Sequence, residues 1–303
     1  MKIQDCTLCP RMCHANRSEG QKGFCRMGDV IYGARAALHM WEEPCLSGTK
    51  GSGAVFFSGC TLRCVFCQNH SIAEGSCGKP ISSARLSEIF LELQKQGAAN
   101  INLVTACHFV PMIVEALETA KKQGLSIPIV YNSSGYERVE TLRMLEAVVD
   151  IWLPDFKYMD AKLGKEYSSA PDYPQVAKEA IAEMVRQQGE CKFDEEGYMT
   201  KGVIVRHLIL PGHVKNSKMV LAYLHETYGE QIYISVMNQY TPMPKVENLS
   251  PLNRKVTKRE YERVLDFAIE LGIEQGYFQD GQTASESFIP MFDFEGIEKS
   301  EAL

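Results

Sequence analysis

The 303-residue chain lacks an excess of positive charge, because 32 lysines and arginines stand against 38 aspartates and glutamates and give a formal net charge of −6. Proteins that bind nucleic acid through its phosphates carry basic surfaces, so this balance excludes a basic nucleic-acid-binding protein. No apolar run approaches the roughly 18 residues that a membrane-spanning helix needs. Residues 1–6 also lack the apolar core of a secretory signal peptide. We therefore expect a cytoplasmic protein with no nucleic-acid or membrane partner.

The rest of the composition is that of an ordinary globular protein, with 45% hydrophobic and 23% charged residues. This excludes disordered and fibrous proteins and leaves room for one large α/β domain or two average ones. Cysteine is the unusual residue, with 11 copies. In a reducing compartment such thiols usually hold metal or carry out redox chemistry, and an odd number argues against a disulfide framework.

The cysteines form two groups and a scattered remainder. The N-terminal group is Cys6, Cys9, Cys13 and Cys25, the second group is Cys60, Cys64 and Cys67, and the scattered ones are Cys45, Cys77, Cys107 and Cys191. Residues 6–45 show little apolar periodicity and many turn formers, which predicts a segment that wraps around a metal rather than a core of its own. We therefore divide the chain into a Cys-rich segment, residues 1–50, and a βα domain, residues 51–303.

Strand and helix signals alternate along the βα domain. The predicted strands are 54–57, 101–105, 127–132, 149–154, 203–210 and 232–237, and the predicted helices are 84–96, 110–122, 139–146, 175–188, 215–227 and 258–271. Glycine follows several of these helices, as helix C-terminal caps require. Residues 191–201 predict a hairpin that leads into the fifth strand. Six βα units with right-handed crossovers predict the α/β class and a parallel barrel or an open part of one.

Three cysteines, Cys60, Cys64 and Cys67, follow the first predicted strand with the spacing CxxxCxxC. The carboxyl ends of barrel strands face the mouth of the barrel, where active sites lie, so the three thiolates can bind the same metal centre. A [4Fe–4S] cluster usually takes four cysteines, and three would leave one iron open to another ligand. The alternatives are three buried cysteines or a zinc knuckle that lacks a ligand.

With the aromatic Phe66 before its third cysteine, this motif resembles that of the radical S-adenosylmethionine (SAM) superfamily. The resemblance implies a partial (β/α)6 parallel barrel of the radical SAM type, with a [4Fe–4S] cluster whose open iron chelates the amino and carboxylate groups of SAM. One electron, from reduced flavodoxin or ferredoxin, would break the C5′–S bond. The resulting 5′-deoxyadenosyl radical would take hydrogen from a substrate, while the protein positions cofactor and substrate.

Residues at the strand ends resemble those of the activating enzymes of pyruvate formate-lyase. Asn102 and Thr105 stand where that family has a glycine-rich second-strand motif, which here lacks glycine, and would receive the methionine amino group. The run 132–135 replaces the family's Asp-Thr-Asn-Gly with Asn-Ser-Ser-Gly. Through Asn132 and Ser134 it would hold the ribose and carboxylate of SAM.

The fourth to sixth strands supply the remaining matches. Asp155 and Lys157 stand in a counterpart of Asp-Leu-Lys, where Asp155 would also coordinate a monovalent cation. Arg206 would capture the methionine carboxylate with its planar guanidinium, Leu208 would flank the adenine, and Asn238 would close the site. A charged residue at a strand end is also commonly a solvated or ion-paired structural residue, so that alternative stays open.

The N-terminal cysteines supply four thiolates, which satisfy tetrahedral zinc or a fully ligated iron–sulfur cluster. Because so little chain surrounds them, we favour a structural zinc over a second cluster, and free structural thiols are the third alternative. Similar cysteine-rich leaders, with the same Cys-Pro-Arg-x-Cys run as residues 9–13, occur in a branch of the activating-enzyme family and in a neighbouring branch.

Cys107 and His108 follow the second strand, where they either face the barrel mouth or pack as buried neutral groups. We expect an accessible groove near Cys107, His108 and Tyr240 that takes a peptide or protein rather than a small molecule. The leading function is therefore SAM cleavage, with glycyl-radical activation of a partner enzyme as one use of the radical. Radical modification of a small molecule or another substrate, and an iron–sulfur electron carrier without SAM chemistry, are the alternatives.

Overall fold

The computed structural model describes residues 3–279 and 290–298. A single curved sheet in the order β10-β9-β8-β6-β5-β4-β2-β1-β3 forms its centre, and β7 pairs with β8. The strands are β1 (Ile31–His39), β2 (Ser52–Phe57), β3 (Lys79–Ile81), β4 (Ile101–Val104), β5 (Ile129–Ser133), β6 (Ile151–Pro154), β7 (Lys192–Phe193), β8 (Met199–Leu208), β9 (Tyr233–Met237) and β10 (Gly276–Phe278).

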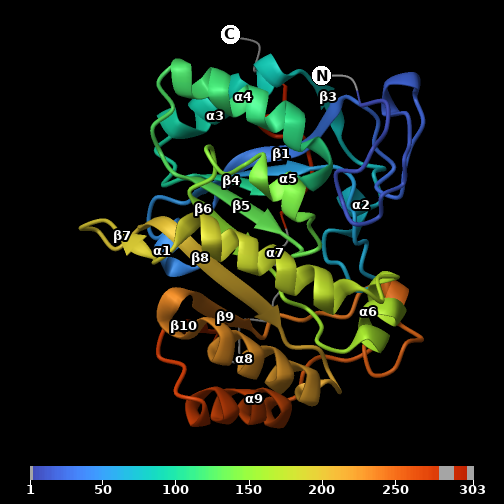
Figure 1. Ribbon diagram of the computed structural model, residues 1–303, viewed down its shortest axis with the longest axis vertical. Coiled ribbons are helices and arrows are strands. Elements are labelled where there is room, and N and C mark those ends of the chain that lie inside the picture. Colours follow the sequence, from blue (N-terminus) through green and yellow to red (C-terminus); the bar gives the residue numbers. More distant parts are fainter. Residues whose placement is uncertain (1–2, 280–289, 299–303) are drawn as a thin grey trace.

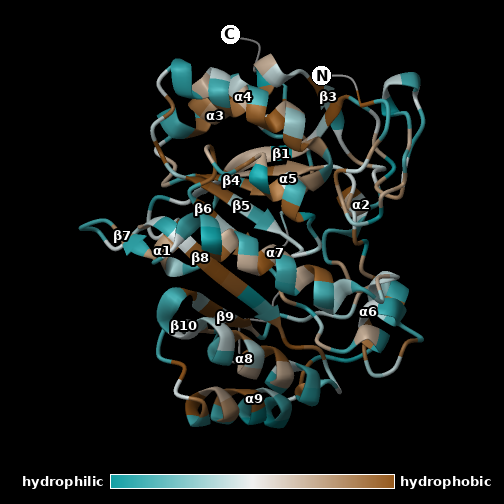
Figure 2. Ribbon diagram, in the orientation of Figure 1, coloured by the Kyte–Doolittle hydropathy of each residue, from teal (hydrophilic) through white to brown (hydrophobic). Residues whose placement is uncertain are grey.

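Helices follow the parallel strands and cover the outer face of the sheet (Figure 1). They are α1 (Pro44–Ser47), α2 (His70–Ala73), α3 (Ser83–Lys95), α4 (Val110–Lys122), α5 (Val139–Arg143), α6 (Ala161–Ser168), α7 (Tyr173–Gln188), α8 (Val214–Tyr228) and α9 (Lys258–Glu270). Figure 2 shows the result as apolar strands enclosed by helices whose outward faces are polar. None of the helices in the described part of the chain is long and apolar enough to cross a bilayer.

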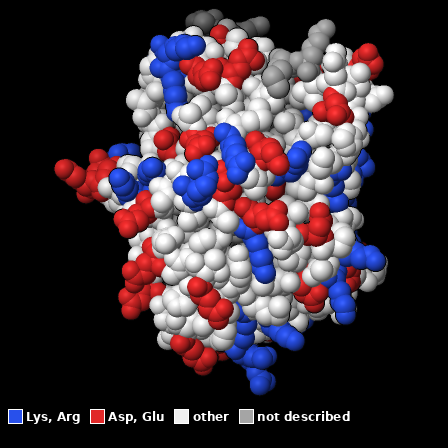
Figure 3. Space-filling model, viewed as in Figure 1, with Lys and Arg blue, Asp and Glu red and all other residues white. Residues whose placement is uncertain are grey.

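The sheet confirms the predicted α/β class and parallel partial barrel. Pairing is parallel from β2 through β4, β5, β6, β8 and β9 to β10. The predicted hairpin at 191–201 is also present, as β7 antiparallel to the start of β8. Figure 3 shows acidic side chains at its protruding tip, where residues 194–196 are Asp-Glu-Glu, and mixed charges over the rest of this face.

The structure adds elements that the sequence did not predict. β10 is a further parallel strand at one edge, and β1 and β3 form an antiparallel extension at the other. β1 belongs to the stretch 1–50, so part of the expected Cys-rich segment contributes to the main sheet. Residues 290–298 cover β1, where the Ala36 amide donates to the Glu295 carbonyl at 2.8 Å and the Ile297 side chain is fully buried.

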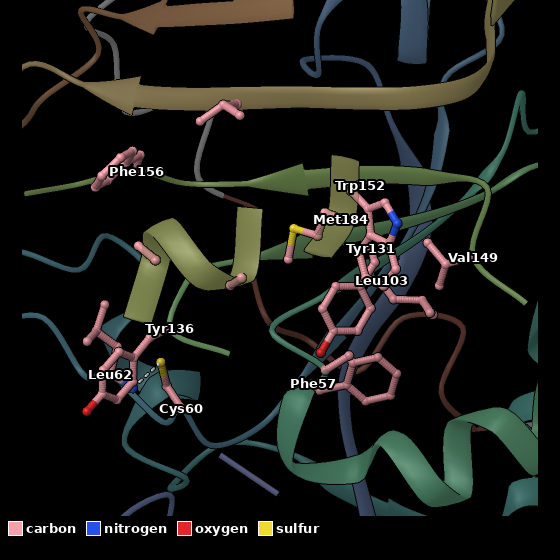
Figure 4. Packing of buried hydrophobic residues seen from close by; sticks show 14 of the residues in the cluster. Phe57, Cys60, Leu62, Leu103, Tyr131, Tyr136, Val149, Trp152, Phe156 and Met184 are labelled. Carbon is pink, nitrogen blue, oxygen red and sulfur yellow. Dashed lines mark hydrogen bonds between the residues drawn. The ribbon is translucent and has the colours of Figure 1, made fainter. Parts of the chain in front are cut away.

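Strand alternation decides which side chains reach the barrel interior. Leu103 on β4, Tyr131 on β5 and Trp152 on β6 point outward and pack under the helices in the main core, as Figure 4 shows. Val104 and Leu153 pack instead with the separate clusters on the concave face. Because successive side chains alternate between faces, Asn102, Asn132, Asp155 and Arg206 share the concave face with those residues.

Candidate active site

The three cysteines of the second group lie on the loop that follows β2. Cys60 is buried, while Cys64 and Cys67 are partly exposed. The backbone amides of Leu62 and Arg63 both donate to the Cys60 sulfur at 3.4 Å, the first of which Figure 4 marks by a dashed line. The Ser168 hydroxyl, at the end of α6, donates to the Cys64 sulfur at 3.1 Å. The loop therefore already presents donors to sulfur atoms that would carry negative charge.

Gly59 allows this loop to turn against the N-terminal segment. Its φ of +87° is a conformation that side chains disfavour. A Cβ atom at this position would lie 2.5 Å from the Met27 Cγ and 2.8 Å from the Cys25 carbonyl oxygen. The loop of the second cysteine group and the N-terminal segment are thus in direct contact.

Burial favours the neutral form of two thiols on this loop, those of Cys60 and Cys67. Burial raises the pKa of Cys60 and raises that of Cys67 to about 12. A thiolate ligand needs the opposite condition, which a bound metal supplies through its own charge. The donor set, three thiols with amide and hydroxyl groups aimed at their sulfurs, fits a cluster with one iron left open.

Asp155 and Lys157 lie beside these thiols. Lys157 Nζ pairs with the Asp155 carboxylate at 2.5 Å, and its charge acts on Cys60, Cys64 and Cys67. Burial acts to lower the pKa of Lys157, but Asp155 and Cys64 together raise it above its ordinary value. The structure therefore brings these two predicted residues together with the cysteine loop.

Phe66 packs under the loop rather than standing free. Its ring centroid lies 6.4 Å from that of Tyr167 and 6.1 Å from that of Tyr240. The Tyr240 hydroxyl donates to the Leu252 carbonyl at 2.6 Å, and both Phe66 and Tyr240 are buried. The aromatic residue of the motif thus supports the position of the third cysteine.

Arg206 has partners that the sequence did not suggest. Its Nε donates to Glu43 at 2.8 Å, and its Nη2 forms ion pairs with both Glu43 and Glu42. Glu42 also accepts from the Asn102 amide at 2.9 Å. These glutamates lie just before α1, far from Arg206 in sequence, and only the adjacent pair of acidic residues could have drawn attention to them.

In the structure Arg206 is therefore part of a buried ion-pair network. Burial acts to lower the pKa of Arg206, but Glu42 and Glu43 hold it well above its ordinary value. The guanidinium fork is already bidentate on Glu43, so it could take a SAM carboxylate only by giving up these bonds. The roles expected for Arg206 and Asn102 in cofactor binding stay predictions.

The other predicted residues at the strand ends lie at paired or adjacent positions on neighbouring strands. Val104 pairs with Asn132, Asn132 with Leu153, and Leu208 with Met237. The Thr105 amide donates to the Asn132 carbonyl, the Ser134 carbonyl accepts from the Tyr173 hydroxyl, and the Asn238 amide donates to Gln279. Among the described residues, the side-chain oxygens of Asn102 and Asn238 are buried without a partner. Unsatisfied buried oxygens of this kind suit a bound polar ligand.

Cys107, His108 and Tyr240 are all buried, so these three residues do not line the accessible groove that was expected near them. His108 Nε2 binds the Ser58 carbonyl at 2.7 Å, and burial lowers its pKa to about 3, so the ring is neutral. Cys107 bonds to the Leu8 carbonyl at 3.6 Å. The alternative of buried neutral packing is therefore the correct one.

Two surface hollows lie beside the β7 hairpin, and neither is lined by a cysteine of the two groups. The larger, of about 470 Å³, is lined by residues such as Cys191, Phe193 and Tyr233, and the smaller, of about 230 Å³, by residues such as Gly48 and Tyr198. Both lie at the amino-terminal ends of the parallel strands. Active sites of parallel barrels form at the opposite, carboxyl-terminal edge, where the cysteine loop lies.

The N-terminal cysteines are close to one another on an irregular segment. Cys6, Cys9 and Cys25 are buried and Cys13 is exposed. The thiol of Cys25 interacts electrostatically with Cys6 and Cys13, and that of Cys9 with Cys25 and Cys6. Within residues 3–279 and 290–298, however, no three His, Cys, Asp or Glu side chains converge to hold a metal ion, so the shared metal site of these four cysteines stays a prediction.

Comparison with known proteins defines the class to which this fold and site belong. The sequence profile of the radical SAM superfamily matches residues 54–212, more than half of the chain. The chain therefore belongs to the radical SAM superfamily and is a radical SAM enzyme. Members of this family use a [4Fe–4S] cluster and SAM.

A curated relative and several solved structures are similar to the chain. An uncharacterized protein of Methanocaldococcus jannaschii, MJ0674, is 28% identical over 283 residues, which are 91% of this chain and 77% of that protein. Methylornithine synthase (PylB) has a TM-score of 0.50 at 13% identity, covering 69% of this chain and 59% of its own. A domain of a pyruvate-formate lyase-activating enzyme from Bacteroides vulgatus has a TM-score of 0.42 at 13% identity, over 56% of this chain and 91% of its own. The likeness to PylB supports the fold alone.

Proposed function

We propose that this protein cleaves SAM reductively at a [4Fe–4S] cluster held by Cys60, Cys64 and Cys67. The observation that carries the proposal is the position of these three thiols, on the loop after β2 at the carboxyl-terminal edge of the parallel sheet. When bound, the cluster and SAM would supply a 5′-deoxyadenosyl radical for hydrogen abstraction. Reduced flavodoxin or ferredoxin is the electron donor that we propose.

The chain's own residues would shape the cofactor site in distinct ways. Amides of Leu62 and Arg63 and the Ser168 hydroxyl would stabilise thiolate charge on Cys60 and Cys64. Lys157, held by Asp155, would add a positive charge beside all three thiols. Lys157 is our first candidate for contact with the carboxylate of SAM, with Asp155 holding its ammonium group in place.

Further residues of the concave face complete the proposed SAM pocket. Asn132, Ser134 and Asn238 have amide or hydroxyl groups suited to ribose and methionine, and Leu208 offers an apolar surface for the adenine. The buried, unpartnered oxygen of Asn238 supports this assignment. Such oxygens are costly in a dry interior unless a ligand or water pairs with them.

The test is anaerobic reconstitution with iron and sulfide, followed by dithionite and SAM. We expect 5′-deoxyadenosine and methionine from the full chain, and loss of both products when Cys60, Cys64 or Cys67 is replaced by alanine. Cys77→Ala is the matched control, because Cys77 lies outside both groups and should leave product formation unchanged. Normal 5′-deoxyadenosine production by a Cys64→Ala variant would contradict the assignment, as would its absence from the reconstituted wild type.

For the substrate we propose glycyl-radical activation of a partner enzyme, on the resemblance of residues 132–135 and 155–157 to the activating enzymes. Incubation with glycyl radical enzymes of the same organism, reductant and SAM should give a doublet glycyl signal in electron paramagnetic resonance. If no such enzyme gives the signal while 5′-deoxyadenosine forms on a metabolite, the substrate is a small molecule instead.

A further inference from the structure

Arg11 of the N-terminal segment bonds to two separate parts of the candidate active site. Its Nε donates to the Thr61 carbonyl at 3.0 Å, within the cysteine loop after β2. Its Nη1 and Nη2 donate to the Ser169 and Ser168 carbonyls at 2.5 and 2.8 Å, at the end of α6. One guanidinium thus joins the N-terminal segment, the cysteine loop and α6, which are far apart in the sequence.

Aromatic rings fix the position of this guanidinium as well. Its Cζ atom lies 3.9 Å from the centroid of the Phe24 ring and 5.1 Å from that of the Tyr136 ring. Tyr136 is itself held in place, because its hydroxyl donates to the Asp172 carboxylate at 2.9 Å. A guanidinium can stack on aromatic faces while it donates several hydrogen bonds in its own plane, whereas an ammonium group cannot. These contacts give Arg11 of the Cys-Pro-Arg-x-Cys run a role that needs no metal at its flanking cysteines.

Ser168 is the residue through which Arg11 can act on a cluster ligand. The Ser168 hydroxyl donates to the Cys64 sulfur at 3.1 Å, while its carbonyl accepts from Arg11. The Val65 amide also donates to the Tyr167 carbonyl at 2.9 Å. The end of α6 and the cysteine loop therefore bond to each other directly, and Arg11 bridges the same two elements from a third.

Arg11 also brings its positive charge to the C-terminus of α6. The last carbonyls of a helix lack partners within the helix and carry partial negative charge. Here that end of α6 lies against Cys64, whose sulfur would be negatively charged as a cluster ligand. A cation on the Ser168 and Ser169 carbonyls offsets the partial charge beside this sulfur.

We propose that Arg11 is a positioning residue, which holds the end of α6 against the cysteine loop so that the Ser168 hydroxyl reaches the Cys64 sulfur. The inference rests on the proposed function of Cys60, Cys64 and Cys67. A donor to a ligating sulfur raises the reduction potential of a cluster, because it stabilises the reduced, more negative state. Through Arg11 the N-terminal segment sets the reduction potential of the open cluster.

The first experiment follows amide hydrogen exchange by mass spectrometry in the metal-free full chain. We expect Arg11→Lys to speed exchange about tenfold in peptides from residues 61–67, because lysine keeps the charge but loses the fork that bonds to both elements. Arg26→Gln is the matched control, since Arg26 is exposed on the same segment and donates to the Glu74 carbonyl at 3.4 Å. It should leave this exchange unchanged.

Two outcomes of this experiment would overturn the proposal. Unchanged exchange of residues 61–67 in Arg11→Lys would mean that Arg11 does not hold the loop. An equal acceleration in peptides from α4 would mean that Arg11 stabilises the whole fold rather than this contact.

The second experiment is a double-mutant cycle on the reduction potential of the reconstituted cluster, measured by spectroelectrochemistry. We expect Arg11→Lys and Ser168→Ala each to make the potential more negative, and the double variant to shift no further than Ser168→Ala alone. Because lysine keeps the positive charge, a shift in Arg11→Lys reports the position of Ser168 rather than the loss of a charge. Additive shifts, or a wild-type potential in Arg11→Lys, would contradict the role of Arg11.

Failure of the proposed function would look different from failure of this inference. In that case the reconstituted wild type would form no 5′-deoxyadenosine with dithionite and SAM, while hydrogen exchange of the metal-free chain would still depend on Arg11. If the wild type forms 5′-deoxyadenosine and Arg11→Lys leaves the exchange unchanged, the inference about Arg11 alone is wrong.

Discussion

Gly59 is the residue at which the N-terminal segment and the cysteine loop after β2 meet, and its substitution tests that contact. We expect Gly59→Ala to lower the free energy of unfolding by about 2–4 kcal/mol, because a positive φ costs roughly 1–2 kcal/mol and overpacking adds a similar amount. Gly97→Ala is the matched control, since Gly97 has a φ of +90° but no atom within 4 Å of an added Cβ. Urea denaturation measures both, and equal losses would mean that the contact is absent.

Ser168 offers a second test, of the hydrogen bond to the Cys64 sulfur. A donor to a ligating sulfur stabilises the reduced, more negative cluster, so Ser168→Ala should make the reduction potential of the open cluster more negative. A neutral hydrogen bond worth about 0.5–1.5 kcal/mol corresponds to roughly 20–60 mV for one electron. Spectroelectrochemical titration checks the shift, with equal iron content as its control. A potential that stays the same or rises would contradict this role.

Single residues differ in how far the sequence reveals their role. Cys60, Cys64 and Cys67 could be singled out as candidate cluster ligands because the spacing CxxxCxxC after a strand is a local pattern. The partners of Arg206 could not, because Glu43 lies 163 positions away and nothing local links the two. A strand-end arginine looks the same in sequence whether it binds a ligand or a buried glutamate.

At the scale of elements, the βα units were predictable because parallel strands buried on both faces appear as short apolar runs between amphipathic helices. β1 was missed because Ile31–His39 contains a glycine, three alanines and an arginine, which give little alternation. β10 is only three residues long, and its assignment depends on pairing with β9. The sequence of a strand shows its hydrophobic periodicity, but it does not show which other strand it pairs with.

His207 joins three elements and makes stability depend on pH. On β8, its ring binds the Phe156 carbonyl after β6 at 2.7 Å and the Ser217 hydroxyl on α8 at 2.9 Å. Burial lowers its pKa to about 4, below the ordinary value. A histidine held neutral in the fold contributes stability that is present above the unfolded pKa of about 6.5 and is lost as the pH falls toward the folded value.

We therefore expect His207 to account for about 3 kcal/mol of the stability that the protein loses between pH 6.5 and 4. Urea titrations across this range should show a shallower loss in His207→Gln, whose amide keeps hydrogen-bonding capacity without titrating there. His108, also held neutral by burial, should leave part of the slope in place. A variant with the same slope as the wild type would exclude His207 as a source of it.

At the scale of the whole molecule, the ion pairs of Arg206 connect the chain before α1 to the far side of the barrel. We expect Glu43→Ala to lower the free energy of unfolding by about 3–5 kcal/mol, because it leaves a buried charge without its main partner. The exposed pair of Lys50 and Glu196, at 2.6 Å, provides the control. Glu196→Ala should cost about 0–1 kcal/mol in the same thermal denaturation assay. Similar losses in the two variants would show that the Arg206 network is not a structural tie.

Residues 290–298, which cover β1, are among the last residues of this sequence to be synthesised. All seven metal-binding cysteines proposed here lie among the first 67 residues, whereas β1 is sealed by Glu295 and Ile297. At synthesis rates of about 5–20 residues per second, roughly 10–50 s separate the emergence of Cys67 from that of the sealing segment. During that interval the nascent chain carries its thiols on an unfinished sheet. Both cysteine groups are therefore synthesised well before the segment that completes the cover of β1.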